Sequence, residues 1–132
     1  MRFLPMACLF CCCASQSAMA QDIDCSNAMS QVEMTFCAGK DLDAADAELN
    51  RVYRLAIKAA RIQDEVLEAD QIPSRKMLRD AQRVWIEFRD RACEAESTLF
   101  RGGTAQSQLY LTCKTRLTES RTKDLEFFAQ PR

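Results

Sequence analysis

The amino-acid sequence predicts a small all-α protein, an antiparallel three-helix domain stapled by two disulfides. The chain of 132 residues has only three glycines and three prolines, too few for a sheet protein with many tight turns. Apolar residues recur at helical spacing over long stretches. The pattern breaks at Pro73-Ser74 and at Gly102-Gly103. We therefore expect helices over about 31–66, 75–99 and 105–128.

The N-terminal segment has the order of a cleaved secretory signal. Arg2 precedes an apolar run that is too short to span a bilayer, and a small-x-small site ends at Ala20. We expect removal of residues 1–20, which leaves a single domain over 21–132. Because Arg2 leaves with the signal, the formal net charge moves from -1 to -2. The alternative is a lipoprotein signal in which Cys12 becomes the acylated N-terminus.

Four cysteines follow this leader, an even number that is typical of a disulfide framework in an exported chain: Cys25, Cys37, Cys93 and Cys113. Cys93 and Cys113 are equidistant from Gly103, and antiparallel helices bring equidistant residues together. This predicts a Cys93–Cys113 bridge, and elimination leaves Cys25–Cys37. The alternative pairing is Cys37–Cys93 with Cys25–Cys113. No CxxC spacing occurs among these four cysteines, which argues against thioredoxin-type chemistry and zinc ribbons.

The first helix starts at a capping box, Ser30 with Glu33 three residues later. Its apolar stripe contains Leu42, Ala45, Leu49, Val52, Tyr53, Ala56, Ile57 and Ala60. Gly39 lowers the stability of the helix by about 1 kcal/mol relative to alanine, which allows a kink or break near Gly39–Asp41.

The second helix is expected to be capped by Ser74 and to bury one narrow seam that includes Trp85 and Phe88 as core residues. The seam consists of Leu78, Ala81, Trp85, Phe88, Ala92, Ala95 and Leu99. The third helix has Leu109, Cys113, Leu117, Ser120, Leu125 and Phe128 on one side.

The sequence lacks the residues and motifs of common catalytic sites. The chain has no histidine, so Ser-His-Asp and Cys-His pairs and histidine-ligated zinc are excluded. Glycine-rich phosphate loops are absent, and Glu94 and Glu96 face different directions at i, i+2. Nucleic-acid binding is disfavoured because the chain is expected to be exported and its basic residues are interleaved with acids: Arg75, Lys76, Arg79 and Arg83. We expect no enzyme activity, no cofactor and no metal.

Two motifs resemble a known family. The first is Cys25, then Ser30-Gln31-x-Glu33-Met34-x-x-Cys37-Ala38 and Asp46-x-x-Leu49-Asn50-x-x-Tyr53. The second is Ala81-Gln82-x-x-Trp85-Ile86-x-Phe88-Arg89-Asp90-x-x-Cys93, continued through Gly102-Gly103 to Cys113, Thr118, Arg121 and Leu125. Together they resemble the lysozyme inhibitor LprI N-terminal domain family over essentially the whole mature chain. The resemblance implies a small exported helical protein that binds and inhibits lysozyme.

The polar members of these motifs are Asp46, Asn50, Tyr53, Gln82, Arg89, Asp90 and Arg121. One interpretation is structural, because polar groups at helical spacing on the first helix could meet partners on the second and fix the helix register. The competing interpretation places some of them on a ligand-facing patch.

An acidic run marks the end of the first helical hairpin. Its acids are Asp64, Glu65, Glu68 and Asp70, with no basic residue among them. Lysozymes are usually cationic, so these residues are candidate partner-binding groups; a second acidic cluster over 41–48 is weaker. The leading hypothesis is a periplasmic or secreted lysozyme inhibitor that acts by steric and electrostatic occlusion. The alternative is an envelope structural or adaptor protein that binds another exported protein, a peptide or a peptidoglycan fragment.

Overall fold

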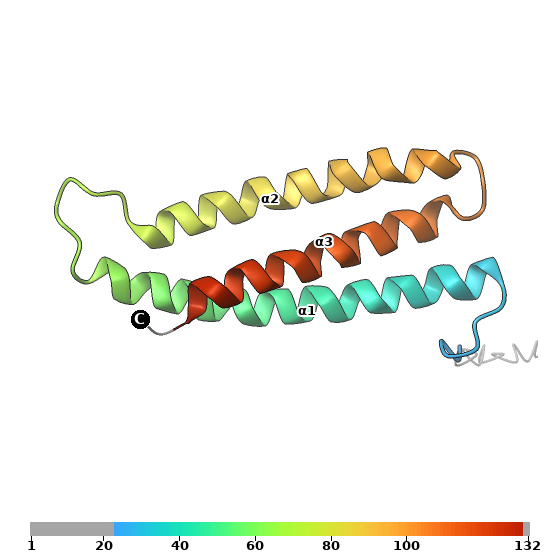
Figure 1. Ribbon diagram of the computed structural model, residues 1–132, viewed down its shortest axis with the longest axis horizontal. Coiled ribbons are helices and arrows are strands. Elements are labelled where there is room, and N and C mark those ends of the chain that lie inside the picture. Colours follow the sequence, from blue (N-terminus) through green and yellow to red (C-terminus); the bar gives the residue numbers. More distant parts are fainter. Residues whose placement is uncertain (1–22, 131–132) are drawn as a thin grey trace, which may run out of the picture.

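The structure, a computed structural model, describes residues 23–130. The predicted leader over 1–20, with Cys12, lies outside the described residues. Three long helices form a bundle in which each helix runs antiparallel to the one before it (Figure 1). They are α1 over Gln31–Asp64, α2 over Ser74–Ser97 and α3 over Gln106–Ala129. A short 3-10 helix, η1 over Thr98–Phe100, follows α2. The described chain contains no strand, so the three-helix prediction is confirmed, with boundaries shifted by one or two residues.

Helix α1 begins at the predicted capping box. The Ser30 hydroxyl accepts a hydrogen bond from the Glu33 backbone N–H at 3.2 Å, and the Glu33 carboxylate accepts one from the Ser30 N–H at 2.9 Å. The break that Gly39 would allow near Gly39–Asp41 does not occur, because α1 continues as one helix to Asp64. Cys37, Ala38 and Leu42 are buried around Gly39, so tertiary packing outweighs the small cost of glycine in a helix.

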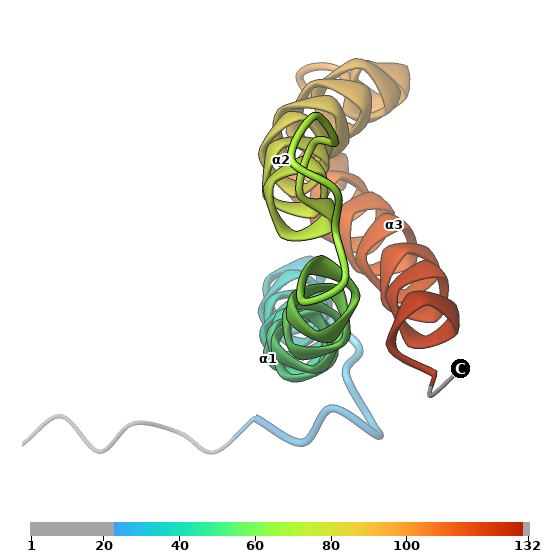
Figure 2. The same ribbon diagram turned by 90° about the vertical axis from the view of Figure 1, so that its left-hand side faces the viewer.

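The apolar core lies toward the end of the bundle that carries the α1–α2 loop. Its buried members are Leu49, Val52, Ala56, Ala60, Leu78 and Leu125, and Tyr53, Ile57, Trp85, Phe128 and Ala129 pack against them. Figure 2 looks along the bundle from this end and shows α3 to one side of α1 and α2. The stripe predicted for α1 supplies most of this core.

Both predicted disulfides are present. Cys93 and Cys113 join α2 to α3 with a Cα–Cα distance of 5.5 Å, and both residues are fully buried. Cys25 and Cys37 join the segment before α1 to the second turn of that helix, also at 5.5 Å between Cα atoms. The alternative pairing through Cys37–Cys93 is therefore wrong. The buried bridge fastens the end of the bundle opposite the apolar core.

The predicted seam of α2 is only partly correct. Leu78 is buried and Trp85 packs against the core, but Phe88 is 60% exposed and Leu99 is 77% exposed. The residues of α2 that are buried are Leu78, Gln82, Arg89, Cys93 and Ser97. The helix is rotated relative to the expectation because the Cys93 disulfide and a buried arginine, rather than Phe88, point inward. On α3, likewise, Ser120 is exposed, and Thr118 and Thr122 are buried instead.

The start of α2 also differs from the prediction. Ser74 is the first residue of the helix and does not cap it; Pro73 holds the N-cap position and has no side chain that could accept a hydrogen bond. The Asp64 carboxylate, at the end of α1, accepts hydrogen bonds from the backbone N–H groups of Ser74 at 2.6 Å and Arg75 at 3.3 Å. The last residue of α1 therefore caps the first turn of α2.

Candidate functional site

A buried arginine on α2 connects all three helices. The Arg89 side chain is 8% exposed, and its Nη1 donates to the Asp46 carboxylate of α1 at 2.8 Å. The same nitrogen donates to the Thr118 hydroxyl of α3 at 3.0 Å, and Nε donates to Asp90 at 2.9 Å. The guanidinium also lies 5.3 Å from the centre of the Trp85 ring. Its planar, multi-donor shape makes these contacts possible from one side chain.

Asp90 extends this network to a second basic residue. Lys114 of α3 lies 3.1 Å from the Asp90 carboxylate, which also receives the Arg89 contact. Partial burial opposes ionisation of Asp90, but the hydrogen bonds from Lys114 and Arg89 outweigh it and hold its pKa below the ordinary value. Asp90 is therefore an ionised carboxylate between two cations at neutral pH.

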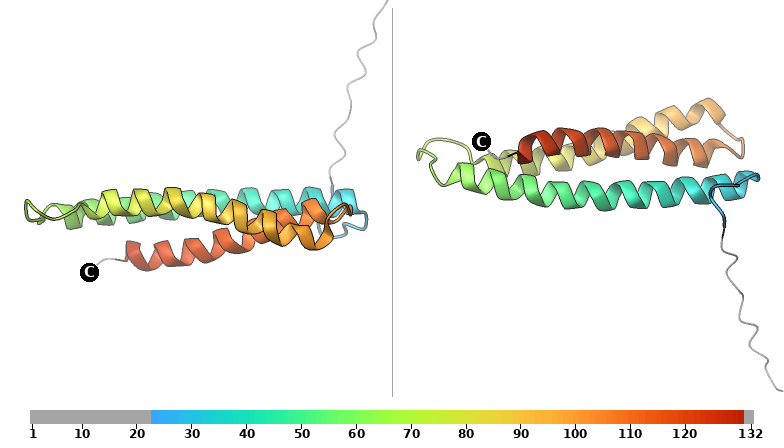
Figure 3. Two further views of the ribbon diagram at one scale, coloured as in Figure 1. Left: turned by 90° about the horizontal axis from the view of Figure 1, so that it is seen from above. Right: turned by 60° about the horizontal axis from the view of Figure 1, so that its bottom comes forward.

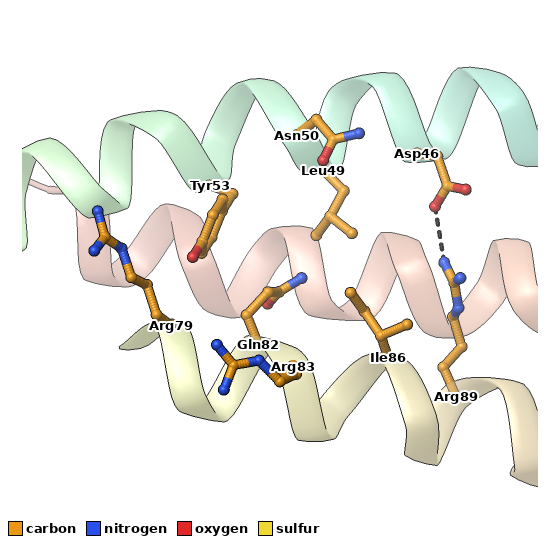
Figure 4. A pocket seen from close by; sticks show the side chains of 9 residues that line it. All are labelled: Asp46, Leu49, Asn50, Tyr53, Arg79, Gln82, Arg83, Ile86 and Arg89. Carbon is orange, nitrogen blue, oxygen red and sulfur yellow. Dashed lines mark hydrogen bonds and ion pairs between the residues drawn. The ribbon is translucent and has the colours of Figure 1, made fainter. Parts of the chain in front are cut away.

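Gln82 and Arg121 form a second polar contact between α2 and α3. Arg121 Nε donates to the Gln82 side-chain oxygen at 3.1 Å. Because arginine only donates, the oxygen of Gln82 must face it, and the amide NH₂ of Gln82 faces away from α3. Figure 4 shows this amide in the space between α1 and α2.

A groove of about 500 Å³ runs between α1 and α2. Figure 4 shows its lining side chains on the two helices, with α3 behind them. The lining residues are Asp46, Leu49, Asn50, Tyr53, Arg79, Gln82, Arg83, Ile86 and Arg89. Of the seven polar motif residues, five line this groove, while Asp90 and Arg121 contact two of these five from outside it.

Sequence reasoning missed two parts of this site. Arg79 and Arg83 line the groove, a role that the interleaving of basic and acidic residues around them does not predict. The available signal was their spacing, since both lie on the α2 face that also carries Gln82 and Ile86. Thr118 and Lys114 were missed as partners of the network, because nothing local to α3 indicates that it faces Asp46 or Asp90.

The acidic run divides into two kinds of residue. The Asp64 side chain is only 11% exposed and is occupied by the start of α2. Glu65, Glu68 and Asp70 are exposed in the loop between the helices. This loop projects beyond the C-terminal end of α3 in both views of Figure 3. We call Glu65, Glu68 and Asp70 the acidic tip.

Neither a metal site nor a membrane span is visible in the described chain. Residues 23–130 contain no group of three or more histidine, cysteine, aspartate or glutamate side chains placed to hold a metal ion. None of the described helices is both long enough and apolar enough to cross a bilayer.

Comparison with known proteins places the chain in a family. The chain is 39% identical over 121 residues to an uncharacterised protein of Rhizobium meliloti (strain 1021), and the match covers 89% of this chain and 87% of that protein. Its fold is similar to the crystal structure of a DUF1311 family protein from Pseudomonas putida KT2440. That similarity has a TM-score of 0.64 and 22% identity, and it covers 76% of this chain and 94% of the other.

The family model described as "Lysozyme inhibitor LprI" matches residues 24–125. This range includes α1, α2, both disulfides and α3 up to Leu125, so the match covers nearly the whole described structure. The chain therefore belongs to the lysozyme inhibitor LprI family.

Proposed function

We propose that this protein is an exported lysozyme inhibitor that acts by occluding its target and has no chemistry of its own. The observation that carries the proposal is the family match over residues 24–125. Two disulfides in so small a chain also fit an extracytoplasmic protein. We place it in the periplasm or outside the cell, after removal of residues 1–20.

The acidic tip is the surface that we assign to lysozyme contact. None of its three carboxylates forms an ion pair with another residue of the described chain, so their charge is available to a partner. Val66 is 86% exposed and Ile72 is 60% exposed in the same loop. Exposed apolar side chains beside free carboxylates suit the rim of a groove on a cationic enzyme.

The loop that carries the tip is held in shape before any partner arrives. The Gln71 N–H donates to the Glu68 carbonyl at 3.1 Å, and the Glu68 N–H donates to the Gln71 side chain at 3.3 Å. Asp64 fastens one end of the loop to α2 through the cap at Ser74. An ordered loop loses less entropy on binding, which favours affinity.

The test is a titration of the oxidised chain, residues 21–132, into lysozymes of several types while lysis of cell walls is followed. Inhibition of at least one type is expected. The variant E65Q/E68Q/D70N should weaken inhibition by about tenfold or more, because three charges leave the contact. E87Q/E94Q/E119Q is the matched control: it removes three exposed acids elsewhere and should inhibit normally.

Two results would count against this proposal in different ways. If no lysozyme is inhibited, the function itself is wrong. If the tip variant and the control variant inhibit equally well, the function stands and the contact surface lies elsewhere.

A further inference from the structure

We propose that the groove between α1 and α2 is a second binding site, which takes a short extended peptide that carries carboxylate groups. The site is separate from the acidic tip and does not depend on lysozyme inhibition. The hydrogen-bond donors, the charge and the length of the groove favour this ligand.

The groove presents donors that the protein leaves unused. Gln82 is 8% exposed, its oxygen is held by Arg121, and its NH₂ group has no hydrogen-bond partner in the described chain. The Asn50 side chain and the Tyr53 hydroxyl, on the α1 wall, likewise form no hydrogen bond with a described residue. A largely buried glutamine that is held in one orientation, with its NH₂ group at the surface of a groove, is suited to backbone carbonyls of a bound chain.

The charge that remains free in the groove is positive. Asp46, the one carboxylate of the lining, is bound by Arg89 at 2.8 Å. Arg79 is exposed and forms no ion pair in the described chain, and Arg83 lies 3.5 Å from Asp80. That carboxylate is already bound more closely, at 2.7 Å, by Lys76. Two guanidinium groups four residues apart on one helix face can therefore receive ligand carboxylates.

The length of the groove favours a chain over a single small anion. On α2 its lining runs from Arg79 to Arg89, which at the rise of an α-helix is about 15 Å. An extended peptide of about four or five residues spans that distance. Leu49 and Ile86 supply apolar wall between the polar groups. The groove volume of about 500 Å³ also lies in the range of known small-ligand sites.

The experiment measures binding of fluorescein-labelled hexaglutamate to the oxidised protein by fluorescence polarisation, with labelled hexaglutamine as the neutral peptide. Wild-type protein should bind hexaglutamate at least tenfold more tightly than hexaglutamine. R79Q/R83Q should weaken that binding by about tenfold, because both arginine contacts are lost. The matched control R54Q/R91Q removes two exposed arginines outside the groove and should bind within twofold of wild type.

A third variant separates the groove from general attraction between charges. Tyr53→Phe keeps the ring and the net charge but removes the hydroxyl, and should weaken binding by about threefold. Melting temperatures of all variants confirm that each is folded. The proposal is overturned if wild-type protein does not bind hexaglutamate, if R79Q/R83Q and R54Q/R91Q bind equally, or if phosphate at the same carboxylate-equivalent concentration displaces the peptide.

Discussion

Replacement of Asp64 by alanine tests the assignment of this residue to the fold rather than to the acidic tip. Its carboxylate accepts hydrogen bonds from the N–H groups of Ser74 and Arg75, and α2 has no side-chain cap of its own. Asp64→Ala leaves both N–H groups without this acceptor. Asp64→Asn keeps one oxygen but removes the negative charge from the N-terminus of α2.

The expected losses follow from these two contributions. Loss of an N-cap acceptor costs about 1 kcal/mol, and loss of a partly buried anion beside a helix N-terminus costs up to about 1 kcal/mol more. Asp64→Ala should therefore lower the free energy of unfolding by about 2 kcal/mol, and Asp64→Asn by about 1 kcal/mol. For a domain of this size, these losses lower the melting temperature by about 8 °C and about 4 °C.

The assay is thermal unfolding of the oxidised protein, followed by circular dichroism at the helical band. Glu68→Ala serves as the control, because Glu68 is exposed in the same loop and its side chain forms no ion pair with a described residue. It should change the melting temperature by less than about 2 °C. If Asp64→Ala melts at the same temperature as Glu68→Ala, the capping role of Asp64 is refuted.

Three further predictions concern the polar network and the buried disulfide. Arg89→Met should lower the free energy of unfolding, measured in urea, by about 2–4 kcal/mol. Arg89→Lys should recover little of this loss, because an ammonium group lacks the planar, multi-donor shape of a guanidinium. A loss under about 1 kcal/mol for Arg89→Met would contradict the role of Arg89. The double variant C93S/C113S should have a free energy of unfolding about 3 kcal/mol lower, measured in guanidinium. An unchanged unfolding midpoint would contradict a stabilising role for this disulfide. The folded-state pKa of Asp90 lies below its unfolded value, so its stabilising effect is present above the unfolded pKa and disappears as the pH falls through the folded pKa. Asp90→Asn should therefore lose less stability than wild type when the pH is lowered. If the two proteins show the same dependence of unfolding free energy on pH, this role of Asp90 is excluded.

Much of the fold could be predicted because it depends on residues close together in the sequence. The Ser30–Glu33 capping box, the apolar stripe of α1 and the Gly102-Gly103 turn each act within a few residues. Gly102 has a φ of 77°, a conformation that glycine adopts readily. The Cys93–Cys113 bridge could be predicted as well, because antiparallel helices joined by a short turn fix which residues face each other.

The candidate site could be predicted only in part. The motif residues Asp46, Asn50, Tyr53, Gln82 and Arg89 do come together on one groove. The sequence does not indicate that Arg79 and Arg83 line the groove, because this depends on which part of α1 lies opposite them in the fold. The acidic run includes Asp64 as a candidate partner-binding residue, although its carboxylate binds the start of a helix that begins ten residues later.

The sequence by itself determined the number of helices and their approximate ends, and it favoured the disulfide pairing that the structure confirms. These features follow from spacing, caps and turn residues, whose effects are local, whereas the family was indicated by the resemblance of the two motifs. Only the tertiary structure decided the rotation of α2, which turns Arg89 and Gln82 inward and leaves Phe88 exposed. That rotation depends on contacts with Asp46, Thr118 and Cys113, which lie 20 or more residues away along the chain. An apolar repeat alone cannot foresee it, because the buried face of this helix is largely polar.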